Sequence, residues 1–141
     1  MLNGELKSKS YFNKFSFIDV SNCVINALRL AFNTQKEDII DRLLVYKYDS
    51  NIEEEIQSET VWGNFLLNNG YKKIPIPIKV GTKRITLNEF IKNLEFTENE
   101  KVIVRLGAHI VYADHNGYYD ENNTHENDIV YYFYIFGGDD G

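Results

Sequence analysis

The chain has 141 residues, of which 43% are hydrophobic and 26% charged, and this composition predicts one folded globular domain over residues 1–141. The formal charge of −6 argues against a nucleic-acid partner, because phosphate binding relies on clustered Lys and Arg. No apolar run approaches the ~20 residues of a membrane span, and residues 1–15 lack the apolar core of a signal peptide. We therefore expect a cytoplasmic protein with no membrane partner. A single Cys excludes an internal disulfide.

Residues 1–20 mix polar and aromatic side chains without a period and are predicted to form an N-terminal arm. From residue 22 to 33 the apolar residues recur at helical spacing, with Ser21 or Asn22 as the N-cap. One face of this helix contains Cys23, Ala27, Leu30 and Ala31. Asn26 and Arg29 lie on the opposite side, so we expect a largely buried helix with one polar edge.

Two further helices follow. Thr34 and Glu37 have the spacing of a capping box, which predicts a helix that runs to about Val45. A helix over 58–69 has Ser58 as its N-cap and ends at Gly70. Its apolar face is formed by Val61, Trp62, Phe65 and Leu66.

The segment 71–80 alternates apolar residues with Pro, which is typical of an extended segment at the edge of a sheet. Thr86 and Glu89 form a second capping box and open a short helix that ends near Leu94.

The chain then changes to β-branched and aromatic runs that predict strands over 101–106, 109–114, 117–120 and 128–136. Asn116-Gly117 predicts a type I′ hairpin turn. Residues 137–141 are expected to form a flexible tail. Helices followed by antiparallel strands place the protein in the α+β class.

Three residues form a candidate catalytic set. Cys23 begins a helix, where unpaired N–H groups and the helix dipole stabilise a thiolate. His109 begins a strand, and Asp120 ends the next strand across a hairpin, so we expect the two to pair. Nucleophile, base and orienting carboxylate are the parts of a cysteine acyl-transfer site. Each residue also has an ordinary interpretation: a core Cys, a surface His and a turn Asp.

The three histidines, His109, His115 and His125, alternate with carboxylates, which is conceivable for a metal site. The spacing matches no metal-binding motif, so we expect neither a metal nor a cofactor.

Several ordered segments together resemble one group of proteins. They are Asn22-Cys23-Val24-Ile25-Asn26-Ala27, Val61-Trp62, Asn69-Gly70-Tyr71-Lys72-Lys73, Thr86-Leu87-Asn88-Glu89-Phe90, Val102-Ile103-Val104-Arg105, Ala108-His109-Ile110-Val111, Asn116-Gly117, Tyr119-Asp120 and Ile129 to Phe136. Over residues 20–136 the chain is similar to small papain-like proteins that are encoded mainly by bacteriophages.

This resemblance implies a papain-like α+β fold, with the helix of Cys23 packed against a sheet formed by 101–136 and two or three further helices on the other side. It implies a cysteine peptidase or related amide hydrolase. Cys23 would be the nucleophile, His109 the base, and Asp120 the orienting group, with Asn122 as the alternative. The substrate would be a protein or peptide.

The chain departs from the papain pattern in having no Gln between Met1 and Cys23. The backbone N–H of Cys23, with Asn22 or Ser21, would then form the oxyanion hole. The alternative function is a weakly active or inactive papain-like scaffold that binds a host or viral protein, as an anti-defence or virion component. The acidic surface and the Tyr-rich segments 118–119 and 131–134 favour it, because exposed Tyr is common at contact surfaces.

Overall fold

The computed structural model describes residues 23–74, 79–80, 83–93, 96–119 and 126–137. The elements follow the order α2 (Cys23–Ala31), α3 (Lys36–Asp49), α4 (Glu59–Asn68), β1 (Tyr71–Ile74), β2 (Lys79–Val80), β3 (Lys83–Arg84), α5 (Leu87–Asn93), β4 (Lys101–Leu106), β5 (His109–Asp114), β6 (Gly117–Tyr119) and β7 (Val130–Phe136). The protein is therefore α+β, as predicted. The predicted arm 1–20 lies outside the described residues, as does the predicted tail from residue 138 onward.

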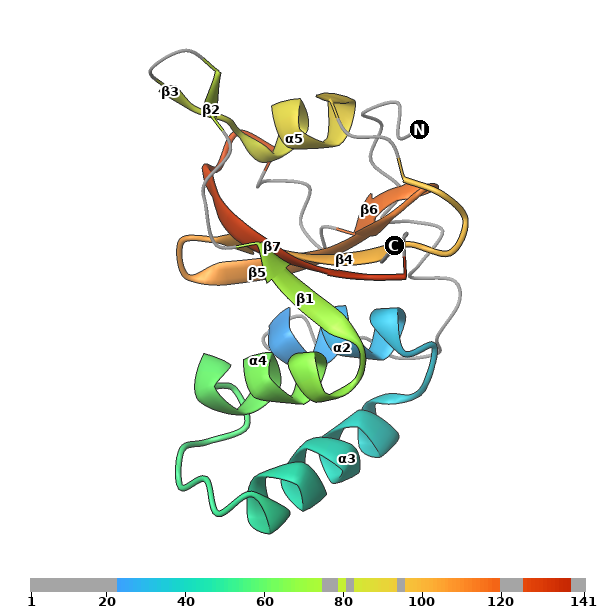
Figure 1. The fold of residues 1–141 in the computed structure, drawn as a ribbon, viewed down its shortest axis with the longest axis vertical. Coiled ribbons are helices and arrows are strands. Elements are labelled where there is room, and N and C mark those ends of the chain that lie inside the picture. The colour runs from blue at the N-terminus through green and yellow to red at the C-terminus, as the bar shows by residue number, and fades with distance from the viewer. Residues whose placement is uncertain (1–22, 75–78, 81–82, 94–95, 120–125, 138–141) are drawn as a thin grey trace.

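The main sheet has five antiparallel strands in the order β1-β7-β4-β5-β6, and β2 and β3 form a separate ribbon (Figure 1). β7, the last strand in the chain, lies between β1 and β4. Among the described strands β1 pairs only with β7, so the edge position predicted for this part of 71–80 is confirmed for residues 71–74.

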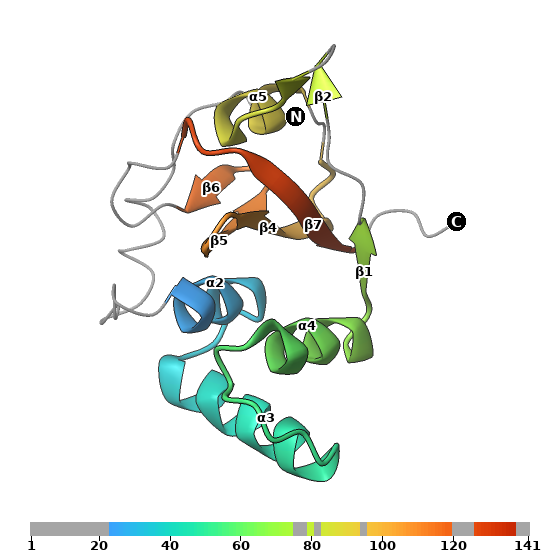
Figure 2. The same ribbon diagram turned by 90° about the vertical axis from the view of Figure 1, so that its left-hand side faces the viewer.

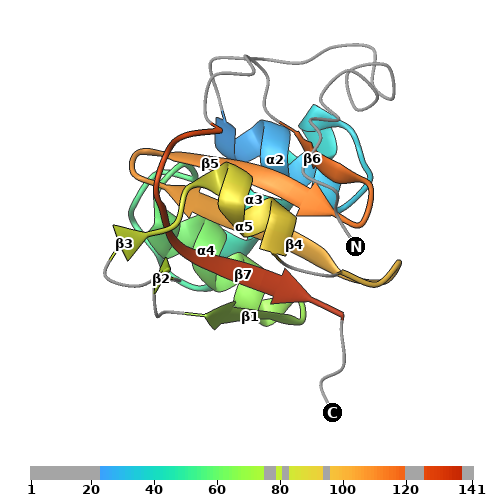
Figure 3. The same cartoon turned by 90° about the horizontal axis from the view of Figure 1, so that it is seen from above.

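The two faces of the sheet carry different layers of helix. α2 and α4 lie on one face with α3 outside them, and α5 lies on the opposite face (Figures 1 and 2). The view from above shows α5 crossing over the sheet (Figure 3). Two or three helices were expected opposite α2. Among the described residues α5 alone is there, because α3 and α4 pack on the same side as α2.

The helix α2 is buried along almost its whole length, because it packs against β5 and β4 on one side and α3 on the other. Its polar edge is also buried: Asn26 is 0% and Arg29 1% exposed. Burial lowers the pKa of the Arg29 guanidinium, against the opposing effect of Glu37. The central helix is therefore buried on its polar as well as its apolar side.

The start of α3 differs from the prediction. Thr34 and Glu37 do not form a capping box, since the Thr34 hydroxyl donates instead to Asp38 Oδ2 at 2.9 Å. Gln35 is the N-cap, without a side-chain cap, and α3 extends to Asp49, four residues beyond the predicted end at Val45.

The caps predicted at Ser58 and at Thr86 are confirmed, and the one predicted at Ser21 or Asn22 lies outside the described residues. Ser58 accepts from the Thr60 N–H at 3.2 Å and opens α4. Thr86 and Glu89 form a reciprocal capping box, with contacts of 2.9 and 3.3 Å. Gly70, which follows α4, has φ +93°, a conformation that favours glycine.

The strands β4 and β5 have the predicted bounds and are joined by a short turn that pairs Leu106 with His109. The turn between β5 and β6 lies where it was predicted, but it is not type I′. A type I′ turn needs positive φ at both central residues. Among the described non-glycine residues only Asn33 and Asn51 have positive φ, and in this turn the positive φ falls on Gly117. Asp114 Oδ1 accepts from the Asn116 N–H at 2.9 Å and closes the turn.

Candidate functional site

Cys23 is the first residue of α2 and is partly exposed. The first N–H groups of a helix have no partner within the helix, and the helix dipole is positive at this end. The first turn of α2 carries no acidic residue that would oppose a negative charge. The end of the helix therefore stabilises a negatively charged side chain at this position.

His109 is the first residue of β5 and is partly buried. His109 is placed near α2 because this helix packs against β5. Cys23 and His109 line the same pocket, which has a volume of about 440 Å³. The structure thus brings together two residues that are 86 positions apart in the sequence.

The remaining predicted site residues are outside the described part of the chain. They are Asp120, its alternative Asn122, and the oxyanion candidates Ser21 and Asn22. The pairing of β5 with β6 is described as far as Tyr112 opposite Tyr119.

Sequence reasoning did not find the other residues of this pocket. Val24, Trp62 and Ile110 form an apolar wall, and Gln57, Arg105 and Ala108 complete the lining. The Trp62 indole N–H donates to the Gln57 carbonyl at 3.2 Å, which fixes the ring against the segment before α4. The pocket lining therefore contains both apolar and polar side chains.

Arg105 comes from β4 and its side chain is 30% exposed. Its Nε donates to the Gly107 carbonyl at 2.7 Å, so the guanidinium is bound to the turn that leads to His109. Its Nη1 lies 3.9 Å from Glu59 Oε1. Arg105 therefore links the pocket to a second group of polar residues.

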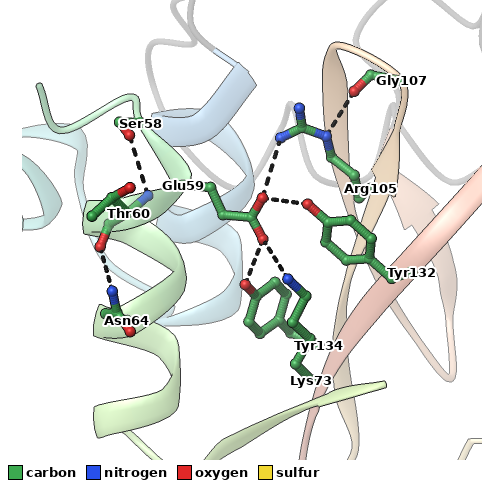
Figure 4. A network of polar contacts seen from close by, with 9 residues as sticks. All are labelled: Ser58, Glu59, Thr60, Asn64, Lys73, Arg105, Gly107, Tyr132 and Tyr134. Atoms are coloured by element: carbon green, nitrogen blue, oxygen red, sulfur yellow. Dashed lines mark hydrogen bonds and ion pairs between the residues drawn. The ribbon is translucent and has the colours of Figure 1, made fainter. Parts of the chain in front are cut away.

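That group, the Glu59 cluster, consists of Glu59, Lys73, Arg105, Tyr132 and Tyr134 (Figure 4). The Tyr134 hydroxyl donates to Glu59 Oε2 at 2.6 Å, the Tyr132 hydroxyl donates to Oε1, and Lys73 Nζ lies 3.2 Å from Oε2. The cluster joins α4 to β1, β4 and β7. No sequence pattern could have predicted this cluster, because the two tyrosines lie 73 and 75 residues from Glu59 along the chain.

Gly63 allows this approach of α4 to the sheet. A Cβ atom at Gly63 would lie 2.6 Å from the Tyr134 hydroxyl and 3.0 Å from the Glu59 side chain. A larger residue would displace the phenol from the carboxylate.

The groups of the cluster stabilise one another's protonation states. Burial favours a neutral Glu59, but the hydrogen bonds from Tyr132, Tyr134 and Lys73 outweigh it and leave the pKa of Glu59 below its usual value. Burial and the carboxylate together raise the pKa of Tyr132 to about 12 and raise that of Tyr134 further. The cluster is thus an ionised carboxylate held by two neutral phenols and a lysine.

The tyrosines expected at a contact surface are mostly in the core. Tyr118, Tyr119 and Tyr134 are at most 2% exposed, whereas Tyr131 is 40% exposed. The Tyr-rich strands are therefore explained mainly by packing.

Among the described residues no group of three or more His, Cys, Asp or Glu side chains could hold a metal ion. His125 and Asp120, which the metal interpretation needs, lie outside them. No helix in the described ranges is long and apolar enough to cross a membrane.

No family model, no curated protein and no solved structure matches the chain.

Proposed function

We propose that the protein is a papain-like cysteine hydrolase that cleaves amides of a peptide or protein through Cys23 and His109. One observation carries the proposal: a Cys at a helix N-terminus and a His at the start of a strand line the same pocket. A nucleophile needs a base within reach and an environment that favours its anion.

The reaction would proceed in two halves. His109 takes the proton of the Cys23 thiol, Sγ bonds to the carbonyl carbon, and the C–N bond breaks as His109 returns the proton to the leaving amine. Water then attacks the thioester carbon, its proton passes through His109 to Sγ, and a carboxylic acid is released. Asp120 would orient His109, and the Cys23 N–H would stabilise the oxyanion.

The substrate would be one restricted peptide or isopeptide bond rather than many. The pocket of about 440 Å³ is at the small end of the range for ligand sites, which favours recognition of few substrate groups.

The proposal is tested by alkylation with iodoacetamide at pH 6. Cys23 is the only cysteine, so total thiol loss reports on it directly. A reference thiol is made in Cys23→Ala protein by Ser50→Cys, at an exposed position after α3. We expect Cys23 to react at least about tenfold faster than this thiol, because at pH 6 a free thiol is mostly protonated.

His109→Ala should remove that advantage, and His115→Ala, in the turn beyond β5, is the matched control. Equal rates for Cys23 and the reference thiol, unchanged by His109→Ala, would contradict the proposal. That result would favour the alternative of a binding scaffold for a host or viral protein. The burial of Tyr118 and Tyr119 removes part of the feature that suggested this alternative.

A further inference from the structure

We propose that Arg105 makes the Cys23 pocket selective for substrates that carry a carboxylate next to the amide to be cleaved. The inference rests on the proposed function, since it names the substrate class of the same pocket. It depends on three features of Arg105: its position, its fixed orientation and its incomplete charge compensation.

The first feature is position. Arg105 lines the pocket together with Cys23 and His109, and alternation along β4 places it on the sheet face that carries α2 and α4. A ligand that reaches the thiol therefore lies beside the guanidinium.

The second feature is orientation. Nε is bound to the Gly107 carbonyl at 2.7 Å, and this contact fixes the plane of the guanidinium. A fixed planar fork loses less freedom on binding than a mobile side chain does, and it matches the two oxygens of a carboxylate.

The third feature is charge. Among the described residues Arg105 pairs with the carboxylate of Glu59, which already accepts from two phenols and lies 3.2 Å from Lys73. Its distance to Arg105 Nη1 is 3.9 Å, at the outer limit of an ion pair. The described residues that line the pocket include no Asp or Glu. Within the described part of the chain the positive charge of Arg105 is thus compensated only partly, and from outside the pocket.

A substrate carboxylate would complete the compensation. In the pocket Arg105 would bind this anionic group of the substrate, and Trp62 and Ile110 would contact an adjoining apolar group. The carboxylate has two possible sources with the same chemistry: an acidic side chain or the C-terminus of a peptide.

The test compares iodoacetate with iodoacetamide, two reagents that differ by one carboxylate. We expect the ratio of their rate constants to be at least about tenfold higher for Cys23 than for the Ser50→Cys reference thiol. Arg105→Gln should lower the ratio for Cys23 at least about threefold. Arg84→Gln, on β3, is the charge-matched control and should leave the ratio unchanged.

The two proposals fail in different ways. Slow iodoacetamide alkylation contradicts the activated thiol, whereas a ratio that Arg105→Gln leaves unchanged contradicts the carboxylate site. If Arg105→Gln slows both reagents equally, Arg105 stabilises the thiolate rather than a ligand, which also contradicts the inference.

A second variant keeps the inference testable if Arg105→Gln fails to fold. Glu59→Gln removes the carboxylate that lies 3.9 Å from Arg105 and should raise the ratio. An unchanged or lower ratio would contradict the inference.

Protection experiments identify the source of the carboxylate. N-acetylaspartate diamide carries no charge and serves as the control. N-acetylaspartic acid α-amide presents a side-chain carboxylate, and N-acetylglycine presents a terminal one. Slower iodoacetamide alkylation in the presence of either charged compound, absent in Arg105→Gln, supports the inference and names the source; protection by neither overturns it.

Discussion

The two faces of the main sheet differ in chemistry. The α5 face is packed with buried apolar residues from α5, β4, β5, β6 and β7. The α2 face has an apolar centre as well, but it also buries Asn26 and Arg29 and carries Cys23 and the Glu59 cluster at one end. The difference indicates that the α5 face mainly stabilises the fold, while the α2 face also carries buried polar groups and the candidate site.

The largest expected loss of stability comes from a substitution in the α5 face. Phe90 is fully buried, and its ring packs against Phe133 with centroids 5.0 Å apart. Phe90→Ala should lower the free energy of unfolding by about 3–5 kcal/mol, through lost burial and a cavity. Urea unfolding measures the change. The alkylation rate of the remaining folded protein should stay within about twofold of wild type. A large loss of thiol reactivity in folded molecules would show that the two faces are not separate in role.

The next largest loss of stability is expected from a substitution in the Glu59 cluster, on the α2 face. Glu59→Gln keeps the shape of the side chain but removes one acceptor and the charge that pairs with Lys73. We expect a loss of about 1–2 kcal/mol in urea unfolding, since the two phenols then compete for one carbonyl oxygen. Glu53→Gln, an exposed residue after α3, is the matched control and should change stability little. Equal stability of the two variants would mean that the Glu59 cluster does not join α4 to the sheet.

The pH dependence of stability sharpens the same contrast. The pKa of Tyr132 is raised from 10.0 to about 12, so its contribution is complete below pH 10 and is lost as pH rises through about 12. The pKa of Glu59 is lowered from 4.5, so its contribution is present above that pH and is lost as pH falls through the lower value.

Unfolding midpoints in urea, measured across this range, should fall on both sides of a plateau. Glu59→Gln should flatten both falls, while Tyr71→Phe should leave the acid side unchanged. The pKa of Tyr71 is raised by burial alone, and the residue is not part of the Glu59 cluster. If the urea midpoints of wild type and Glu59→Gln depended on pH in the same way, the Glu59 cluster would not be the source of this pH dependence.

The smallest expected effect lies on α3, away from both faces. Arg42 and Asp38 form an i,i+4 ion pair of 2.8 Å, and their side chains are 47% and 44% exposed. Arg42→Gln should cost no more than about 0.5 kcal/mol, because water and salt screen such pairs. A loss measured by urea unfolding that exceeds the loss for Glu59→Gln would reverse the ranking of these regions.

Much of the fold could be predicted because its signals are local. The strands 101–106 and 109–114 follow from unbroken β-branched and aromatic runs, and the helix after Ser58 follows from its cap and apolar face. The same capping pattern gave a correct prediction at Thr86 and a wrong one at Thr34. At Thr34 the side chain of Asp38 takes the hydroxyl, a competition that the spacing alone does not decide.

The candidate site could be predicted only in part. Cys23 and His109 were found because each begins an element, which a sequence pattern reveals. Arg105 was missed because a charged residue within a strand ordinarily faces solvent. Its role depends on Gly107 and Glu59, and the contact between Arg105 and Glu59 exists only after α4 packs on the sheet.

The most direct test of the central claim is the pH profile of Cys23 alkylation by iodoacetamide, measured for wild type, His109→Ala, Asp120→Asn and Asp114→Asn. The account predicts that wild-type reactivity is already high at acidic pH and level across neutrality, because thiolate and imidazolium stabilise each other. His109→Ala should shift the profile to a single step near the ~8.5 of a free thiol. Asp120→Asn should lower the alkylation rate only at the alkaline end of the profile, where the His109 imidazolium loses its proton. Asp114→Asn should do little, since Asp114 is held by Tyr112 and the turn. A single step near ~8.5 in wild type, unmoved by His109→Ala, would contradict the account.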